Sequence, residues 1–444
     1  MKYTVGIDLG STTTKAVVLD AESPGHRVLG RGITNSRSNY DVACGVALSD
    51  ALVDARFGMI ASELERAGVS AERREAGIDE LTLRFREEQY RRQLAELDHV
   101  VRSLVTESAG GRREVEVTAV DEVLRSLAAE AGELFTPTAR RKSDFFRDVA
   151  GSQYMRKAEH LCGGSGCGSR AAGPRFDYIV GLYDKAILVV ENMESSAGAY
   201  EECIAAAVAN LQDSLPEIAA GVEGSMRTTF DKLASVGTGY GRARLPFDDA
   251  QIRSEILCHG LGAFTMFPGT RTVLDIGGQD TKAIQVDANG IVTSFQMNDR
   301  CAAGCGRYLG YIADELNLGL HELGPLANEA KRPVRINSTC TVFAGAELRE
   351  RLSLGEKRED ILAGLHRAIT LRAMSLVARS GGVKNEFTFT GGVANNPAAV
   401  NALRQLIVEN YGEVTMNISP ASIYTGALGA AIFAGRSLEE VPAA

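Results

Sequence analysis

A short segment that occurs twice in the chain constrains the fold more than any other feature. The first copy is Asp8–Ala16 (DLGSTTTKA) and the second is Asp275–Ala283 (DIGGQDTKA). Asp, Gly, Thr, Lys and Ala recur in the same register, and an apolar run flanks each copy on both sides. This pattern predicts a β-hairpin with small and hydroxylated residues at its tip. Two matched hairpins predict two duplicated domains that face each other across a cleft.

Both hairpin tips carry the groups that a phosphate chain requires. Phosphate sites use close backbone N–H groups, hydroxyl donors and a carboxylate that holds Mg²⁺. Asp8 and Asp275 end the first strand of each hairpin and are the predicted Mg²⁺ pair. Gln279 and Asp280 are the candidates to orient an attacking water. The candidate phosphate-binding residues are Gly10, Ser11, Thr12, Thr13, Lys15, Gly277 and Gly278.

A third glycine-containing turn lies late in the chain. The short strand Phe387–Phe389 leads into Thr390-Gly391-Gly392, and Gly391 and Gly392 would let an adenosine lie against bare backbone. Asn396 then caps a helix that has Pro397 at its first position. Any one of these segments alone is adequately explained as a structural turn without a binding role. The three in this order predict an ATP site.

The glycine-rich stretch Val236–Arg242 (VGTGYGR) invites comparison with a dinucleotide-binding fingerprint. It lacks the strand–helix unit and the downstream ribose-binding acid that such a site needs. We interpret it as a turn with an interdomain role.

Two phosphate hairpins followed by a Thr-Gly-Gly loop resemble the actin/hexokinase/heat-shock-chaperone ATPase superfamily. The resemblance implies an α/β fold in which two RNase-H-like domains close on Mg-ATP. A length of 444 residues corresponds to roughly three domains, so a long α-rich insertion is expected as well. The predicted segments are first strands of lobe I at 1–35, the insertion at 36–185, the remainder of lobe I at 186–270, lobe II at 271–425, and a C-terminal helix returning toward lobe I at 426–444.

Much of the insertion has the apolar periodicity of α-helices. Between Glu80 and Val105 apolar residues recur on one helical stripe, whereas Glu114–Val117 alternates as a strand does. The net charge of −9 argues against a nucleic-acid or membrane-surface partner. No apolar run approaches the ~18 residues of a membrane span. The N-terminus has no secretory pattern, so the expected compartment is the cytoplasm, where cysteines stay free, bind metal or act in catalysis.

Two of the eight cysteines stand in a distinctive setting. Cys301 follows Asn298-Asp299-Arg300, Cys340 follows Ser338-Thr339, and each is expected near the N-terminus of a helix. The helix dipole and free N–H groups there stabilise a thiolate or an anionic iron–sulfur cluster. A [4Fe–4S] cluster takes four cysteines, so two ligands per chain require a second chain.

The other cysteines and one histidine have more ordinary settings. Cys305 lies one turn from Cys301 and is interpreted as a structural residue near the cluster. Cys162 and Cys167 flank a glycine-rich loop and are either a metal pair or, as we favour, two thiols of a flexible loop. Cys44, Cys203 and Cys258 are expected to be packing residues. His259, one turn after Glu255, is expected to be a core histidine.

The motifs DIGGQD, NDRCAAG and STCTVFA resemble those of the ATP-dependent electron activases. This group comprises the activators of 2-hydroxyacyl-CoA dehydratases and the ATP-binding subunits of class I benzoyl-CoA reductase. The resemblance covers residues 1–35 and about 190–444. The long insertion and the segment Gly32–Asp41 favour the larger benzoyl-CoA reductase subunit, because the activators are shorter.

The resemblance implies the following function. Cys301 and Cys340 ligate a [4Fe–4S] cluster shared with a smaller homologous ATP-binding subunit, and reduced ferredoxin loads an electron onto it. Binding and hydrolysis of Mg-ATP drive the electron to two substrate-binding catalytic subunits, which reduce benzoyl-CoA to a cyclic dienoyl-CoA. Two alternatives remain open. One is a homodimeric activator of a 2-hydroxyacyl-CoA dehydratase, and the other is a small-molecule kinase of the same fold whose cysteines only pack.

Overall fold

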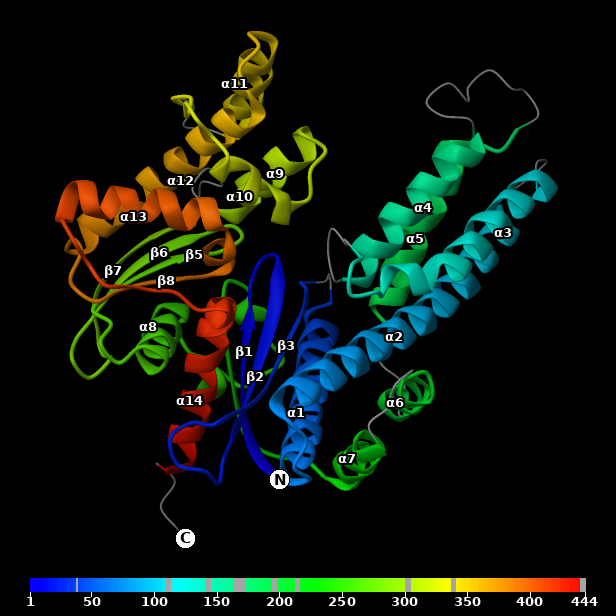
Figure 1. Cartoon of the computed structure of the whole chain (residues 1–444), viewed down its shortest axis with the longest axis horizontal. Helices are drawn as coiled ribbons and strands as arrows, with labels where there is room; N and C mark the ends of the chain where they lie inside the picture. The colour runs from blue at the N-terminus through cyan, green and yellow to red at the C-terminus, as the bar shows by residue number, and fades with distance from the viewer. Residues whose placement is uncertain are drawn as a thin grey trace. The chain divides into compact units, whose positions relative to one another are not determined.

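The computed structural model describes residues 1–36, 39–108, 113–139, 145–162, 173–193, 198–211, 216–299, 305–336 and 341–439. The chain divides into two compact units (Figure 1). One unit is formed by Met1–Asp54 together with Phe230–Ala444, and the other by Ala55–Thr229.

The first unit contains two β-sheets built on the same plan. The strand orders are β3-β2-β1-β4 and β7-β6-β5-β8-β9. In each sheet the hairpin predicted from the repeat is present, and its register pairs Asp8 with Lys15 and Asp275 with Lys282. The strands are β1 (Lys2–Leu9), β2 (Thr13–Asp20), β3 (Val28–Asn35), β4 (Asp231–Thr238), β5 (Thr272–Ile276), β6 (Thr281–Val286), β7 (Val292–Asn298), β8 (Phe387–Thr390) and β9 (Met416–Asn417).

The helices of this unit cover both faces of each sheet. They are the first part of α1 (Tyr40–Arg66), α8 (Glu255–Met266), α9 (Gly306–Glu315), α10 (Leu320–Asn328), α11 (Thr341–Ser353), α12 (Arg358–Ser380), α13 (Pro397–Tyr411) and α14 (Thr425–Glu439). Asn396 accepts hydrogen bonds from the N–H groups of Ala398 and Ala399 at the start of α13, which confirms the predicted cap.

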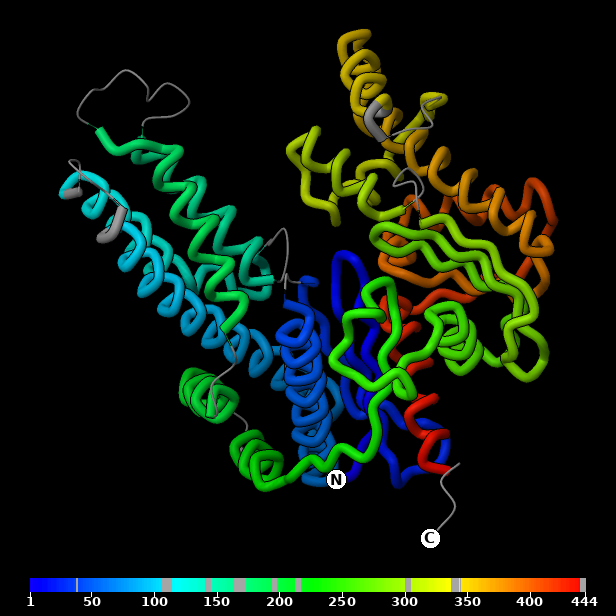
Figure 2. Tube along the Cα trace, turned by 180° about the vertical axis from the view of Figure 1, so that it is seen from behind, coloured from blue at the N-terminus to red at the C-terminus, as the bar shows by residue number. Residues whose placement is uncertain are grey.

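Helices α8 and α14 lie between the two sheets (Figures 1 and 2). Small residues allow this packing. A Cβ on Gly6 of β1 would collide with the backbone of α14 at Ala427 and Ala431, and one on Gly262 of α8 would collide with the carbonyl of Thr425. The glycine- and alanine-rich sequence of α14 therefore brings backbones into direct contact.

Strand periodicity decides which side chains point toward this central helix pair. In β1, Tyr3, Val5, Ile7 and Leu9 pack in one cluster with residues of α1. The alternate residues point the other way, since Thr4 Oγ1 donates to the carbonyl of Ala431 in α14. Asp8 is on this second face. In β5, Val273 packs against α8, so Asp275 is on the face toward α8 in the same manner.

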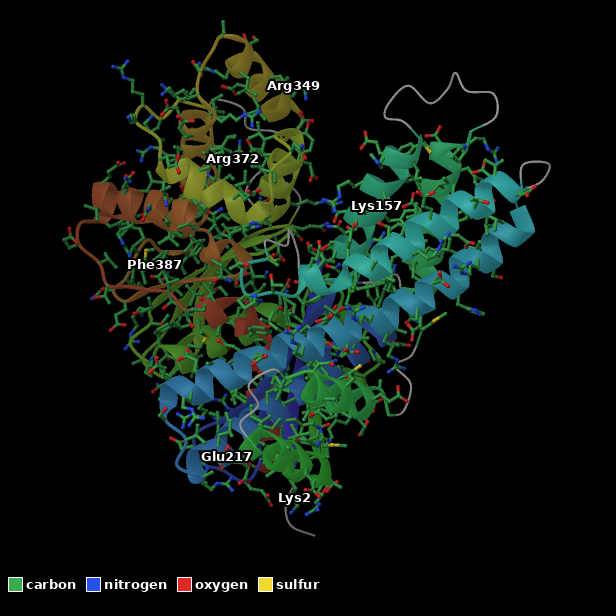
Figure 3. All side chains as sticks on the ribbon, turned by 45° about the vertical axis from the view of Figure 1, so that its right-hand side comes forward. Lys2, Lys157, Glu217, Arg349, Arg372 and Phe387 are labelled. Carbon is green, nitrogen blue, oxygen red and sulfur yellow. The ribbon has the colours of Figure 1, made fainter. Side chains whose placement is uncertain are left out.

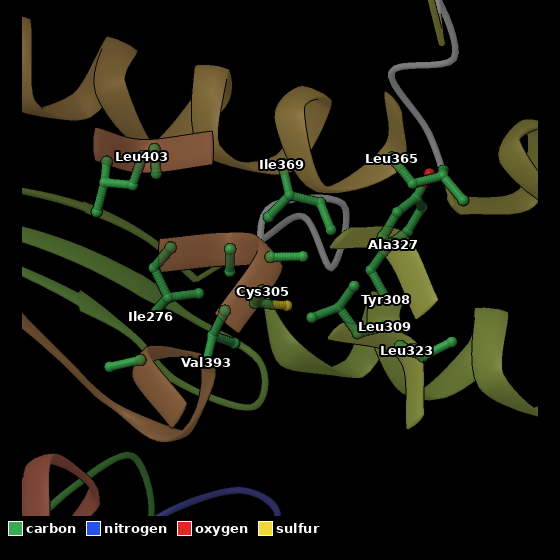
Figure 4. Close-up of a cluster of buried hydrophobic side chains, with 14 of the residues drawn as sticks. Ile276, Cys305, Tyr308, Leu309, Leu323, Ala327, Leu365, Ile369, Val393 and Leu403 are labelled. Carbon is green, nitrogen blue, oxygen red and sulfur yellow. The ribbon is translucent and has the colours of Figure 1, made fainter. Parts of the chain in front are cut away.

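The outer face of the second sheet is covered by α12 and α13. Leu274 and Ile276 of β5 join a large core with Ile369 of α12 and Leu403 of α13 (Figure 4). Helix α12 is the one helix among the described residues that is long and apolar enough to cross a membrane, and 61% of its apolar window is buried in the protein. Its buried apolar side chains are part of the hydrophobic core.

The second unit is helical. It contains the end of α1 and α2 (Ala71–Ser108), α3 (Arg113–Glu130), α4 (Phe146–Cys162), α5 (Phe176–Glu191), α6 (Ala199–Ala209) and α7 (Pro216–Arg227). The predicted stripe of α2 is buried, and Lys157 of α4 forms an ion pair with Glu130 of α3 (Figure 3).

The predicted strand at Glu114–Val117 is wrong, because these residues belong to α3. A run of four alternating residues is too short to distinguish the two periods. Glu116 is polar but fully buried, and its Oε1 lies 2.8 Å from Nε of Arg175. The helical unit also begins and ends later than the limits of 36 and 185 expected for the insertion, since the start of α1 packs on the first sheet and α6 and α7 belong to the helical unit.

Candidate nucleotide site

Asp8 lies at the end of β1, where two glycines make room for its carboxylate. The residue is 4% exposed, and Nζ of Lys15 lies 3.5 Å from its Oδ2. Gly239 has φ +102°, and a Cβ there would collide with Asp8 Oδ1. A Cβ on Gly426 would lie 3.1 Å from Asp8 Oδ2. The carboxylate therefore sits against bare backbone from two different segments.

Asp275 occupies the equivalent place at the end of β5 and is more enclosed, with 1% exposure. Thr390 Oγ1 donates a hydrogen bond of 2.8 Å to its Oδ2, Nδ1 of His259 lies 3.2 Å from that oxygen, and Nζ of Lys282 lies 3.6 Å from Oδ1. Burial alone would raise the pKa of Asp275, but His259, Lys282 and the threonine hydroxyl together hold it well below its usual value. The carboxyl is therefore ionised.

Lys282 is the centre of a buried group of charges. Its Nζ lies 2.8 Å from Asp280 Oδ2 and 3.8 Å from Glu255 Oε2, in addition to its contact with Asp275. Burial disfavours the charged ammonium, yet the three carboxylates raise the pKa of Lys282 above its ordinary value. Burial raises the pKa of Glu255, against the opposing effect of Lys282.

The two hairpin turns approach each other at their tips. The turns close through bonds from Gly10 N–H to the Thr13 carbonyl and from Gly277 N–H to the Asp280 carbonyl, 3.2 and 3.0 Å long. A Cβ on Gly278 would collide with Thr12 Oγ1 of the first hairpin. The tips of the two hairpins therefore touch, as the duplicated-domain prediction requires.

The sequence analysis missed or underrated two segments that lie beside the site aspartates. The first is Thr238-Gly239, which we interpreted as part of a turn. β4 pairs with β1 as β8 pairs with β5, so Thr238 lies beside Asp8 as Thr390 lies beside Asp275. Gly239 and Gly391 both have positive φ values, +102° and +85°. A Thr-Gly pair that ends a strand in both halves was the available signal.

The second is the pair Glu255 and His259 on α8. His259 is buried, as expected of a core histidine, but its imidazole faces Asp275. Burial would lower the pKa of His259, and the neighbouring Asp275 raises it above its ordinary value. No sequence pattern places α8 between the sheets, so this contact follows only from tertiary packing.

The start of α9 is joined directly to the second hairpin turn. The N–H groups of Gly306 and Arg307 donate to the carbonyls of Gly277 and Gly278, at 2.8 and 2.7 Å. Cys305 caps α9 and is fully buried in the core with Ile276 and Val393 (Figure 4). It is a structural residue, as predicted. Cys301 and Cys340 lie outside the described residues, and α11 begins directly after Cys340.

The remaining cysteines are packing residues where the structure describes them. Cys44, Cys203 and Cys258 are buried, as predicted. The favoured interpretation of Cys162 as a thiol of a flexible loop is wrong, because Cys162 is the buried last residue of α4. Cys162 Sγ donates to the carbonyl of Pro174, at 3.5 Å. Cys167 lies outside the described residues. Within the part of the chain that is described, no group of three or more His, Cys, Asp or Glu side chains could hold a metal ion.

The donor set fits Mg²⁺ with a phosphate chain. Each sheet contributes one carboxylate at the end of a hairpin strand. Glycines border Asp8, whereas the side chains of Thr390, His259 and Lys282 hold Asp275. Hard oxygen ligands that leave several waters on the cation are what Mg²⁺ prefers. Asp8 and Asp275 would hold the cation, which when bound would neutralise charge on the phosphates.

Comparison with known proteins decides the family. A model of the BadF/BadG/BcrA/BcrD ATPase family matches residues 5–434. The chain belongs to this family. This ATPase has the actin/hexokinase-like fold that the sequence predicted.

Relatives of this ATPase include activating proteins. The (R)-2-hydroxyglutaryl-CoA dehydratase activating ATPase of Acidaminococcus fermentans is 44% identical over 204 residues, which are 46% of this chain and 76% of that protein. The 2-hydroxyisocaproyl-CoA dehydratase activator of Clostridioides difficile is 43% identical over 201 residues, 45% and 72% of the two chains. A benzoyl-CoA reductase subunit of Thauera aromatica is 32% identical over 203 residues, 46% and 71%.

Solved structures agree on the fold. The crystal structure of component A of the Acidaminococcus fermentans dehydratase superposes with a TM-score of 0.54 at 23% identity, covering 99% of this chain and 100% of that one. The Clostridium difficile activator with bound ADPNP gives 0.53 at 23% identity, covering 100% and 99%.

Proposed function

We propose that this ATPase is an ATP-driven electron activator of a 2-hydroxyacyl-CoA dehydratase or a closely similar partner enzyme in the reducing cytoplasm. The observation that carries the proposal is the 44% identity to an activating ATPase, combined with the two facing carboxylate hairpins. Our sequence-based preference for the larger benzoyl-CoA reductase subunit has weaker support, because that comparison reaches only 32%.

Hydrolysis in this proposal takes place between the two hairpins. Asp8 and Asp275 hold Mg²⁺, the hairpin glycines and hydroxyls bind the phosphates, and Gly391 and Gly392 border the adenosine. Gln279 is the better candidate to orient a water, since Asp280 is engaged by Lys282 at 2.8 Å. Asp280 and Lys282 then fix the turn and the charge of Asp275.

The route from ATP to the electron begins at α9. Hydrogen bonds from the N–H groups of Gly306 and Arg307 tie its first turn to the hairpin carbonyls. A shift of that turn on hydrolysis would therefore move the segment that carries Cys301. Cys301 and Cys340 would supply two thiolates to a [4Fe–4S] cluster shared with a second chain, and such a cluster carries one electron when bound.

Anaerobic purification of the full chain tests the proposal. We expect iron, sulfide, ATP hydrolysis, and activation of a 2-hydroxyacyl-CoA dehydratase in the presence of reduced ferredoxin and Mg-ATP. Cys301→Ser and Cys340→Ser should lose iron, whereas Cys203→Ser, a buried control in the helical unit, should keep it. Iron-free protein that transfers phosphate to an alcohol or acid would show a kinase instead.

A benzoyl-CoA reductase subunit is the second candidate. The specific observation in its favour is the helical unit Ala55–Thr229, since the shared stretch is 76% of the activating ATPase but only 46% of this chain. Co-purification of a stable complex with three other polypeptides, including a smaller homologous subunit, would support it. A homodimer that meets its partner only transiently would support the activator.

A further inference from the structure

His259 lies beside the carboxylates of the candidate nucleotide site. Its Nδ1 is 3.2 Å from Asp275 Oδ2. On its other side, a Cβ on Gly426 would lie 2.8 Å from His259 Nε2 and 3.1 Å from Asp8 Oδ2. The imidazole therefore contacts Asp275 of one sheet, and Gly426 borders both the imidazole and Asp8 of the other sheet.

The helix that carries His259 is held rigidly between the sheets. A Cβ on Gly429 of α14 would collide with the carbonyl of Cys258, the residue before His259. One turn earlier, Glu255 lies 3.8 Å from Nζ of Lys282 and 3.6 Å from Nη1 of Arg242. Close backbone packing on one side and ion pairs on the other fix the position of the imidazole relative to both sheets.

Nδ1 lies 3.2 Å from Asp275 Oδ2 but forms no well-formed hydrogen bond there, and it is buried without another hydrogen-bond partner among the described residues. A buried polar atom in this condition costs stability. Hydrogen bonds in catalytic sites are often poorly aligned without ligand and tighten when it binds.

We propose that His259 is a positioning residue for ATP hydrolysis, which donates from Nδ1 to Asp275 and holds that carboxylate toward Asp8. The inference rests on the proposed function, in that ATP is hydrolysed between the two hairpins. His259 does not touch the phosphates in this proposal. It fixes the direction of a carboxylate that does so through the cation.

The alternative is that His259 only fills space, and steady-state ATP hydrolysis by the full chain distinguishes the two. Asparagine places an amide nitrogen near the position of Nδ1, glutamine places one near Nε2, and leucine removes both donors. We expect His259→Asn to keep kcat within about fivefold. We expect His259→Leu and His259→Gln to lower kcat by about 10- to 100-fold, the range seen when groups that orient metal ligands are removed, with KM within about threefold.

Cys258→Ala is the matched control on the same helix. Cys258 is fully buried and packs with Val236, Ala430 and Ala434. Its truncation should lower the melting temperature and leave kcat unchanged. If His259→Leu does not fold, the ranking of Asn against Gln still decides the question.

Each outcome has a defined meaning. Absence of ATP hydrolysis in the wild-type chain would overturn the proposed function itself. Wild-type hydrolysis with an equally active His259→Leu chain, a higher KM at unchanged kcat, or a glutamine variant better than the asparagine variant would each overturn the role of His259 alone.

Discussion

The two hairpins have the same sequence pattern and the same register, yet they hold their charges differently. In the first, Asp8 is the one carboxylate among the described residues that pairs with Lys15, at 3.5 Å. In the second, Lys282 is 3% exposed and meets three carboxylates. Asp275 also accepts a hydrogen bond from the Thr390 hydroxyl and faces His259. The equivalent Thr238 instead donates its hydrogen bond to the backbone carbonyl of Arg253. The charged groups of the second hairpin are therefore more enclosed and more extensively paired than those of the first.

The largest expected effect comes from neutralising the two aspartates. Asp8→Asn and Asp275→Asn should each reduce ATP hydrolysis by at least about 100-fold, because each removes a charged ligand from the cation site. Only Asp275→Asn should also destabilise the protein strongly, by about 3 kcal/mol, since it removes a buried partner of Lys282. Phosphate release and denaturant unfolding measure the two effects. Equal losses of stability would erase the proposed difference between the halves.

Replacing the lysine of each hairpin should destabilise the protein to different extents. Lys282→Met leaves three buried carboxylates without their shared cation and should cost about 3 kcal/mol, whereas Lys15→Met should cost about 1 kcal/mol. The loss of unfolding free energy caused by Lys282→Met should be larger at pH 8 than at pH 5. Burial already raises the pKa of Glu255, and an acid whose folded pKa is raised loses stability as pH rises through its unfolded and folded values. Unfolding curves at both pH values provide the check, and a deficit independent of pH would contradict it.

The sequence predicted the parts of this site that follow from local pattern. The repeat predicted both hairpins, and register then placed each aspartate opposite its lysine. It also predicted the cap at Asn396. These features depend on residues close together in the chain, where strand periodicity and capping chemistry suffice.

The missed parts depend on contacts that no local pattern encodes. Lys15 and Lys282 occupy equivalent places in the repeat, but only α8 brings Glu255 to one of them. The position of α8 results from its close packing on α14, more than 150 residues further along. Four alternating residues at Glu114–Val117 suggested a strand, and tertiary packing made them part of an 18-residue helix.

Glycine substitutions at the tips should have an intermediate effect. A Cβ on Gly278 would collide with Thr12 of the opposite hairpin, whereas one on Gly10 meets the flexible end of Lys15 at 2.9 Å and the Thr13 carbonyl at 2.8 Å. Gly278→Ala should therefore weaken ATP binding about tenfold, equal to about 1.4 kcal/mol, and Gly10→Ala should weaken it less. Titration with a non-hydrolysable ATP analogue measures both. A larger loss in Gly10→Ala would show that contact between the tips matters less than the shape of the first turn.

The two threonines that end β4 and β8 should give the smallest and most specific difference. Thr390→Val removes one of three groups that hold Asp275, so His259 and Lys282 remain and kcat should fall only about threefold, or about 0.7 kcal/mol in the barrier. Thr238→Val removes a hydrogen bond to a backbone carbonyl, 3.0 Å long, and should cost about 1 kcal/mol of stability without changing kcat. Parallel measurement of kcat and of unfolding free energy separates these outcomes. If Thr238→Val lowers kcat as much as Thr390→Val does, the first hairpin also depends on its threonine, and the two halves share more of their chemistry than their contacts indicate.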